Sequence, residues 1–192
     1  MKARRFALML VVCITLVGAA ACVTTSTSSA DQAALAISSG NFPPGYRDWT
    51  LISIARLGGK VNDLRAKLGN DVAIKAYRQG TLPFPDGAII ARLAWKAVPS
   101  EENNEALRPF IEEKLGKAEA DRVLADSFVA GPATNIQFMV KDSKKWASTG
   151  GWKFIEFDNG KPAPEAEGGE KTCFSCHEPT AGNDYLFTRY AP

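Results

Sequence analysis

The stretch WTLISIARL, residues 49–57, is rich in β-branched and apolar residues and follows the turn-like FPPGYRD. It therefore predicts a first β-strand. A second strand is expected at DLRAKLGN, residues 63–70. Its side chains alternate between apolar and basic: Leu64, Arg65, Ala66, Lys67 and Leu68. This period of two is typical of a strand with one buried face, and a short connection between the two strands favours antiparallel pairing.

The rest of the chain predicts further strands separated by short helices. A helix should begin at Asn70 or Asp71 and end at Gly80, because these residue types cap helix ends. Further strands are expected at 88–98, 127–142 and 152–158, and Gly131 and Pro132 should break or bulge the middle one. The pattern predicts an α+β fold, an antiparallel β-sheet with short helices on one side and the CFSCH segment near the C-terminus.

Residues 103–126 are strongly helical, with Pro109 near a start and Gly116 as a stop. Apolar residues recur there at helical spacing: Leu107, Phe110, Ile111 and Leu115. The simpler interpretation is an amphipathic helix packed on the sheet. The alternative is a lid over a ligand pocket.

The C-terminal run CFSCH, residues 173–177, carries the most specific chemistry. A structural zinc site needs four Cys or His ligands, but His177 is the single histidine and the other two cysteines lie near the N-terminus. A thioredoxin-like dithiol would follow a strand in an alternating strand-helix pattern, whereas this motif follows a Pro/Gly/Glu-rich run. In the interpretation we favour, Cys173 and Cys176 attach one haem c through thioethers, and His177 is the proximal iron ligand.

The N-terminus predicts export. Residues 1–21 combine basic residues, an apolar run and the small residues Ala19, Ala20 and Ala21, as a signal peptide does. Because Cys22 follows directly, we favour a lipoprotein signal with Cys22 lipidated, and simple secretion is the alternative. Residues 22–44, which begin Ser/Thr-rich, would be a flexible tether. The predicted location is the periplasmic side of a bacterial envelope, with membrane contact only through the lipid.

Length and charge limit the other possibilities. Residues 45–192 are most simply one domain, large enough for a core and a cofactor pocket. The 192-residue chain has a formal net charge of +2, and removal of Lys2, Arg4 and Arg5 with the leader leaves 20 basic and 21 acidic residues. Nothing in this balance indicates a nucleic-acid partner.

Several stretches in order resemble the cytochrome P-460 family and its relative cytochrome c′-beta. They are GYRDW at 45–49, PFPDG at 83–87, VKD and GGWKF within 140–154, and CFSCH with the tail NDYLFTRYAP. The resemblance implies a mainly antiparallel sheet, usually a homodimer, with a five-coordinate c-type haem against one sheet face. Its open iron position would bind nitric oxide or turn over hydroxylamine. An electron-donor or acceptor protein would exchange electrons with the haem. Residues 103–126 would be an insertion.

The resemblance also identifies distal candidates. Arg92 stands where hydroxylamine-oxidising members have a lysine bonded to the porphyrin, so an ordinary haem is expected unless Lys96 makes a shifted link. The alternatives for Arg92 are a solvated strand residue or a partner of a haem propionate. Gln137 stands where those members carry a carboxylate, and glutamine cannot act as a general base. Gln137 either faces the iron or lines a polar wall.

The apolar cap that cytochrome c′-beta members place over the iron is not evident in the sequence. The first two strands offer Leu51, Leu64 and Leu68, and Phe138 has the wrong strand parity if Gln137 faces the haem. We therefore predict a mono-haem c-type cytochrome with an open axial position that binds a small nitrogen oxide such as nitric oxide. One alternative is an oxidoreductase acting on hydroxylamine or peroxide. The other is an electron carrier with Met139 as the sixth ligand.

Overall fold

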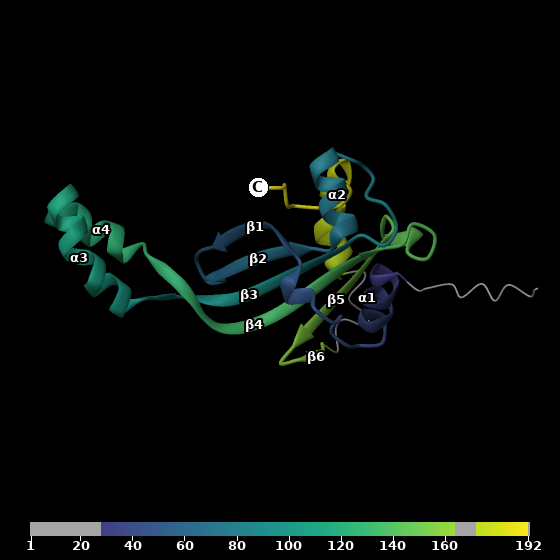
Figure 1. Ribbon diagram of the computed structural model, residues 1–192, viewed down its shortest axis with the longest axis horizontal. Coiled ribbons are helices and arrows are strands. Elements are labelled where there is room, and N and C mark those ends of the chain that lie inside the picture. The colour runs from purple at the N-terminus through teal and green to yellow at the C-terminus, as the bar shows by residue number, and fades with distance from the viewer. Residues whose placement is uncertain (1–27, 164–171, 192) are drawn as a thin grey trace, which may run out of the picture.

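The computed structural model describes residues 28–163 and 172–191. Its centre is one antiparallel sheet whose strands follow each other in chain order (Figure 1). The strands are β1 (Thr50–Leu57), β2 (Asp63–Gly69), β3 (Ile89–Pro99), β4 (Phe128–Lys141), β5 (Trp152–Asp158) and β6 (Lys161–Pro162). The predicted α+β class and the strand positions are confirmed. The predicted leader at 1–21 lies outside the described residues.

One face of the sheet packs against α1 (Ser29–Ser38) and the segment that follows it. Ala33 and Ile37 of α1 join a core with Leu93, Phe138 and Phe157 from three strands. The flexible tether predicted for 22–44 is therefore wrong over 29–38, because the apolar side of this helix has a sheet face to cover. Residues 22–27 lie outside the described part of the chain.

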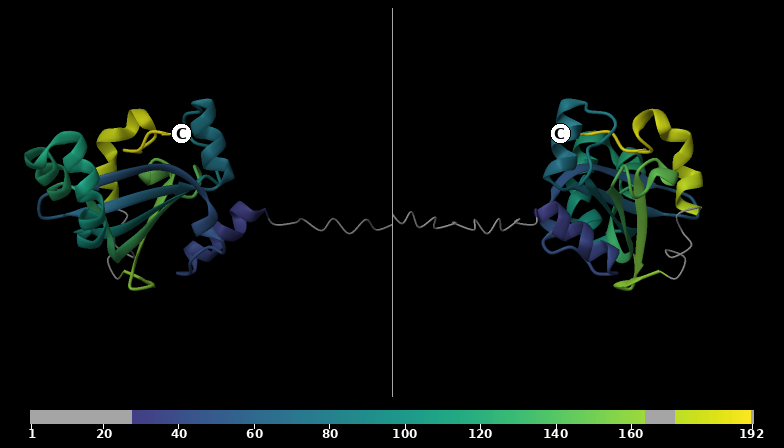
Figure 2. Two further views of the ribbon diagram at one scale, coloured as in Figure 1. Left: turned by 60° about the vertical axis from the view of Figure 1, so that its left-hand side comes forward. Right: turned by 90° about the vertical axis from the view of Figure 1, so that its right-hand side faces the viewer.

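The other sheet face is covered by α2 (Asp71–Gln79) and the C-terminal segment. Figure 2 shows α2 and this segment on the side of the sheet opposite α1, so the prediction that the helices lie on one side is wrong. The predicted caps of α2 are confirmed, with Asn70 as N-cap and Gly80 in the left-handed conformation. The Asn70 side chain also binds the backbone of Ile89 and Gly87, which ties this helix to the start of β3.

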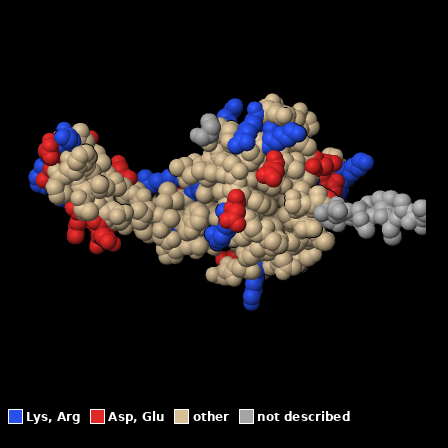
Figure 3. Space-filling view, in the orientation of Figure 1, with Lys and Arg blue, Asp and Glu red and all other residues tan. Residues whose placement is uncertain are grey.

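The helical region predicted at 103–126 is a helical hairpin, α3 (Glu101–Leu115) and α4 (Lys117–Ala125), that extends away from the sheet. The prediction that it packs on the sheet is wrong: α3 has no buried residue, and Phe110 is 61% exposed. Pro109 lies inside α3, which begins after the N-cap Ser100, whereas Gly116 ends it as predicted. Figure 3 shows acidic and basic side chains gathered on this hairpin.

Strand β4 bulges where predicted. Its pairing with β3 shifts register on both sides of Trp95, and a β-carbon at Gly131 would lie only 2.7 Å from the Val98 side chain. Glycine is thus required for the close approach of the two strands at this irregularity. Within residues 28–163 and 172–191, no helix has the length and apolar character needed to span a membrane.

Candidate functional site

The motif CFSCH lies on a helical stretch over residues 172–177. Positions three and four apart share one side of a helix, and the structure accordingly turns Cys173 and His177 into the same cavity. Both Cys173 and Cys176 are free thiols. Burial raises the pKa of the Cys173 thiol, and the charge of Glu156 raises it further. A redox-active thiol has a lowered pKa, so this environment does not favour dithiol chemistry.

A hydrogen bond to the backbone orients His177. Its Nδ1 lies 2.6 Å from the carbonyl oxygen of Tyr185, and because a carbonyl only accepts, Nδ1 carries the proton. The rings of Phe154 and Phe187 flank the imidazole, each with its centroid 4.8 Å away. Burial lowers the pKa of His177, although the bond to Tyr185 partly opposes this. A neutral imidazole with a free Nε2 lone pair is the form that binds a metal.

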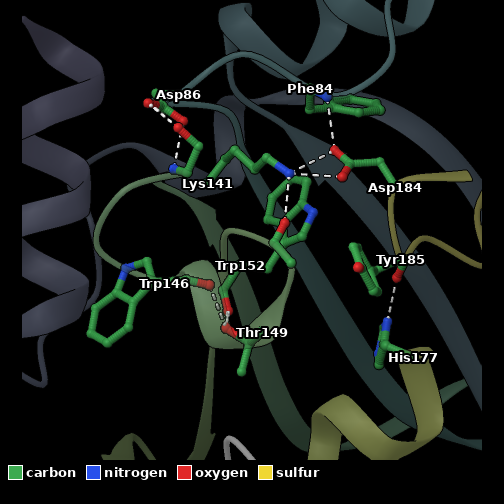
Figure 4. A network of polar contacts seen from close by, with 11 residues as sticks. Phe84, Asp86, Lys141, Trp146, Thr149, Trp152, His177, Asp184 and Tyr185 are labelled. Carbon is green, nitrogen blue, oxygen red and sulfur yellow. Dashed lines mark hydrogen bonds and ion pairs between the residues drawn. The ribbon is translucent and has the colours of Figure 1, made fainter. Parts of the chain in front are cut away.

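A buried ion pair holds the segment that supplies this carbonyl (Figure 4). The Nζ of Lys141 lies 2.7 Å from Oδ1 of Asp184 and donates to the carbonyl of Gly150. The carboxylate of Asp184 also accepts the N–H of Phe84 at 2.7 Å. Asp184 directly precedes Tyr185, and both have left-handed backbone conformations. The pair therefore joins the end of β4, the turn before β3 and the loop that orients His177.

The cavity in front of His177 has a volume of about 510 Å³, within the usual range for cofactor sites. It lies between the sheet and the C-terminal segment. One part of its wall is apolar and includes Ile90, Met139, Phe154 and Leu186. The other part is polar.

The polar wall is a row of four side chains across four strands. Cross-strand pairing puts Lys67 beside Arg92, Arg92 beside Gln137, and Gln137 beside Glu156, and all four line the cavity. The Nη1 of Arg92 donates to Oε1 of Gln137 at 2.8 Å, and Nε2 of Gln137 donates to Glu156 at 2.6 Å. Asn135 bridges the same two charged residues with bonds of 2.8 Å from Arg92 and 2.7 Å to Glu156. The amide of Gln137 is thus fixed in one orientation.

The structure brings the two distal candidates, Arg92 and Gln137, into contact with each other in the cavity that holds His177 and Cys173. The alternative that Arg92 is a solvated strand residue is wrong, since it is half-buried. Its burial lowers its pKa, as does the neighbouring Arg65.

The other sequence candidates are distributed differently. Lys96 is exposed and its Nζ donates to the carbonyl of Val61, so it does not line the cavity. Leu68 packs in the core on the opposite face, as Phe138 does, and neither Leu51 nor Leu64 is part of the cavity wall. Met139 does line it, next to Ile90 and Phe154.

Sequence reasoning missed Glu156 and Lys67. Glu156 lies within the strand predicted at 152–158 and has the parity of Phe154, and Lys67 was predicted on the polar side of the second strand. The alternation marks both as facing one side. Only the strand register shows that they extend the row of Arg92 and Gln137.

The residues present fit a c-type haem. His177 offers a free Nε2 and a fixed ring at the partly apolar cavity, which Cys173 also lines. Cys176 is an exposed free thiol on the same short helix and is not part of the cavity wall. These three residues would hold the group. None of the cavity wall comes from the α3–α4 hairpin, so the hairpin is not a lid over this cavity.

Comparison with known proteins agrees with this geometry. The family described as Cytochrome P460 matches residues 43–188, which include the sheet, α2, the polar row and CFSCH. No curated protein matches the sequence. The chain therefore belongs to the cytochrome P460 family and is a haem-binding cytochrome.

Proposed function

We propose that the protein is an exported mono-haem c-type cytochrome with an open axial position, and that it binds a small nitrogen oxide, most simply nitric oxide. The observation that carries the proposal is the polar row in the cavity that His177 lines: its central residues, Arg92 and Gln137, are hydrogen-bonded to neighbouring side chains rather than offered as metal ligands. Haem, when bound, supplies an iron centre for a diatomic ligand.

The chain's own residues have three tasks in this proposal. Cys173 and Cys176 form the thioethers, and His177 is held by the carbonyl of Tyr185 as a neutral proximal ligand. Gln137 keeps one amide N–H beyond the bond to Glu156 and can donate it to a bound ligand. The apolar wall with Phe154 and Leu186 limits the entry of water.

The proposed setting follows from the N-terminus. Residues 1–21 act as the export signal, and lipid on Cys22 anchors the protein on the periplasmic side of the envelope. An electron-donor or acceptor protein exchanges electrons with the haem, and the protein forms a homodimer, as the family resemblance implies.

Absorption and resonance Raman spectra of the purified holoprotein test the proposal. The reduced form should be five-coordinate and high-spin, with the spectrum of an unmodified c-type haem, and should take up nitric oxide or carbon monoxide directly. Met139→Ala is the matched variant, because Met139 also faces the cavity. A six-coordinate low-spin reduced form that becomes high-spin in Met139→Ala would show an electron carrier instead.

One observation favours a second candidate, an oxidoreductase acting on hydroxylamine or peroxide. Although Gln137 cannot take up a proton, the carboxylate of Glu156 lies 2.6 Å from its Nε2 and lines the same cavity. Glu156 could therefore act as the general base that Gln137 is not.

The second candidate is tested by hydroxylamine turnover in the wild type, Glu156→Gln and Gln137→Glu. If Glu156 is the base, Glu156→Gln should lose roughly 10²–10⁴ in rate, with nitric oxide affinity retained. Equal, very slow turnover in the wild type and in Glu156→Gln would leave ligand binding as the function.

A further inference from the structure

The basic end of the polar row has more positive charge than its neighbours neutralise. Arg65, Lys67 and Arg92 lie on one face of β2 and β3 and line the cavity. Two carboxylates lie nearby, but Asp63 is bound to Nε of Arg65 at 2.9 Å. The carboxylate of Glu156, on β5, accepts hydrogen bonds from Gln137 and Asn135 of β4. It is therefore three strands away from Lys67, which lies on β2.

Lys67 and Arg92 are directly opposite each other on adjacent strands, where like charges destabilise a sheet. Among the described residues, neither side chain forms an ion pair, and the side chain of Lys67 forms no hydrogen bond, although its backbone is paired within the sheet. Burial lowers the pKa of Lys67, and the charges of Arg65 and Arg92 lower it further. A bound anion would relieve this repulsion.

Arg92 itself has a donor without an acceptor. Its Nη1 and Nη2 donate to the neutral oxygens of Gln137 and Asn135, while Nε is buried and has no partner within the described chain. A buried, unsatisfied donor costs free energy, and in a native site it commonly marks the place of a missing partner. Lys67 is paired directly with Arg92 on the neighbouring strand, and both residues line the cavity.

We propose that Lys67 and Nε of Arg92 form an oxyanion site at the β2–β3 end of the cavity. This inference rests on the proposed haem function and deepens it. The ligand chemistry is a small planar oxyanion that accepts a charge-assisted hydrogen bond from each residue. Such an oxyanion has two sources here, a haem propionate carboxylate or free nitrite, which is the anionic relative of the proposed ligand.

The position of the site is compatible with both sources. Glu156 at the other end of the row raises the pKa of Cys173 through its charge, so that end is near the thioether attachment. Lys67 lies three strands further, which is about 14 Å at the usual strand spacing. In haem the propionates occupy the edge opposite the thioether-forming vinyl groups. A free anion could reach the two residues through the cavity, which both of them line.

Lys67→Gln in the holoprotein is the decisive variant, because the Lys67 side chain makes no hydrogen bond that the substitution would break within the described chain. Lys67→Arg keeps the positive charge and should retain the anion binding that Lys67→Gln loses. Lys96→Gln is the matched control, since it removes an exposed lysine from the adjacent strand outside the cavity. Two quantities are measured: the Kd of ferric protein for sodium nitrite by absorption titration, and the infrared carboxylate bands of the haem propionates.

If nitrite occupies the site, Lys67→Gln should weaken nitrite binding roughly tenfold or more with unchanged propionate bands. If a propionate occupies it, those bands should shift in Lys67→Gln and return in Lys67→Arg. The proposal is overturned when both measurements in Lys67→Gln equal those of Lys96→Gln. Failure of the haem function is seen separately, as wild-type protein without covalent haem or without nitric oxide uptake.

Discussion

Replacing Lys141 by Met should destabilise the protein strongly, because it removes one partner of a buried ion pair. The side chains of Lys141 and Asp184 are only 3% and 5% exposed. With methionine at 141, the carboxylate of Asp184 keeps the Phe84 N–H at 2.7 Å but no counter-ion, and the carbonyl of Gly150 loses its donor. Leaving one buried charge unpaired typically costs about 3–5 kcal/mol. The melting temperature of a chain of this size would then fall by about 6–20 °C.

The assay is denaturant unfolding of the holoprotein followed by circular dichroism. The double variant Lys141→Met/Asp184→Asn should recover much of the loss, since it removes both charges. Asparagine also tolerates the left-handed backbone at 184 and keeps an acceptor for Phe84. Asp121→Asn, which weakens exposed ion pairs with Arg108 and Lys117, is the control and should leave the unfolding midpoint unchanged. If Lys141→Met unfolds at the same midpoint as Asp121→Asn, the buried ion pair does not stabilise the fold.

Three further predictions concern the cofactor, the N-terminus and alkaline stability. When the protein is made in a host with a c-type maturation system, its intact mass should equal that of the chain plus one haem. The double variant Cys173→Ala/Cys176→Ala should have the mass of the chain alone, and a wild-type protein with that unmodified mass would contradict the prediction. Labelled fatty acid should enter the wild type but not Cys22→Ser, whereas a free N-terminus further along the chain would indicate simple secretion. Burial raises the pKa of Tyr77, so the unfolded state ionises first and stability should fall above about pH 10. In Tyr77→Phe, the free energy of unfolding should decrease less steeply with pH in this range. An unchanged slope would show that other groups cause the loss of stability.

Features that depend on residues adjacent in the chain could be predicted from the amino-acid sequence. Alternation in 63–70 identified a strand with a basic face, and Asn70 and Gly80 identified the ends of α2, because caps and period-two patterns are local. The haem-attachment motif around His177 could likewise be identified from the sequence, since both thiols and the imidazole lie within five consecutive residues. The family resemblance added Arg92 and Gln137 as two separate distal candidates.

Features that depend on contacts between residues far apart in the chain could not be predicted and became visible in the three-dimensional structure. The strand register places Glu156 and Lys67 in the polar row with Arg92 and Gln137. A register shift of one residue would turn each side chain to the other face of the sheet. The apolar periodicity of 103–126 described an amphipathic helix but could not say which surface it covers, and in the structure α3 packs on α4 rather than on the sheet. The pair of Lys141 and Asp184 links residues 43 apart in the chain, a contact that no local pattern encodes.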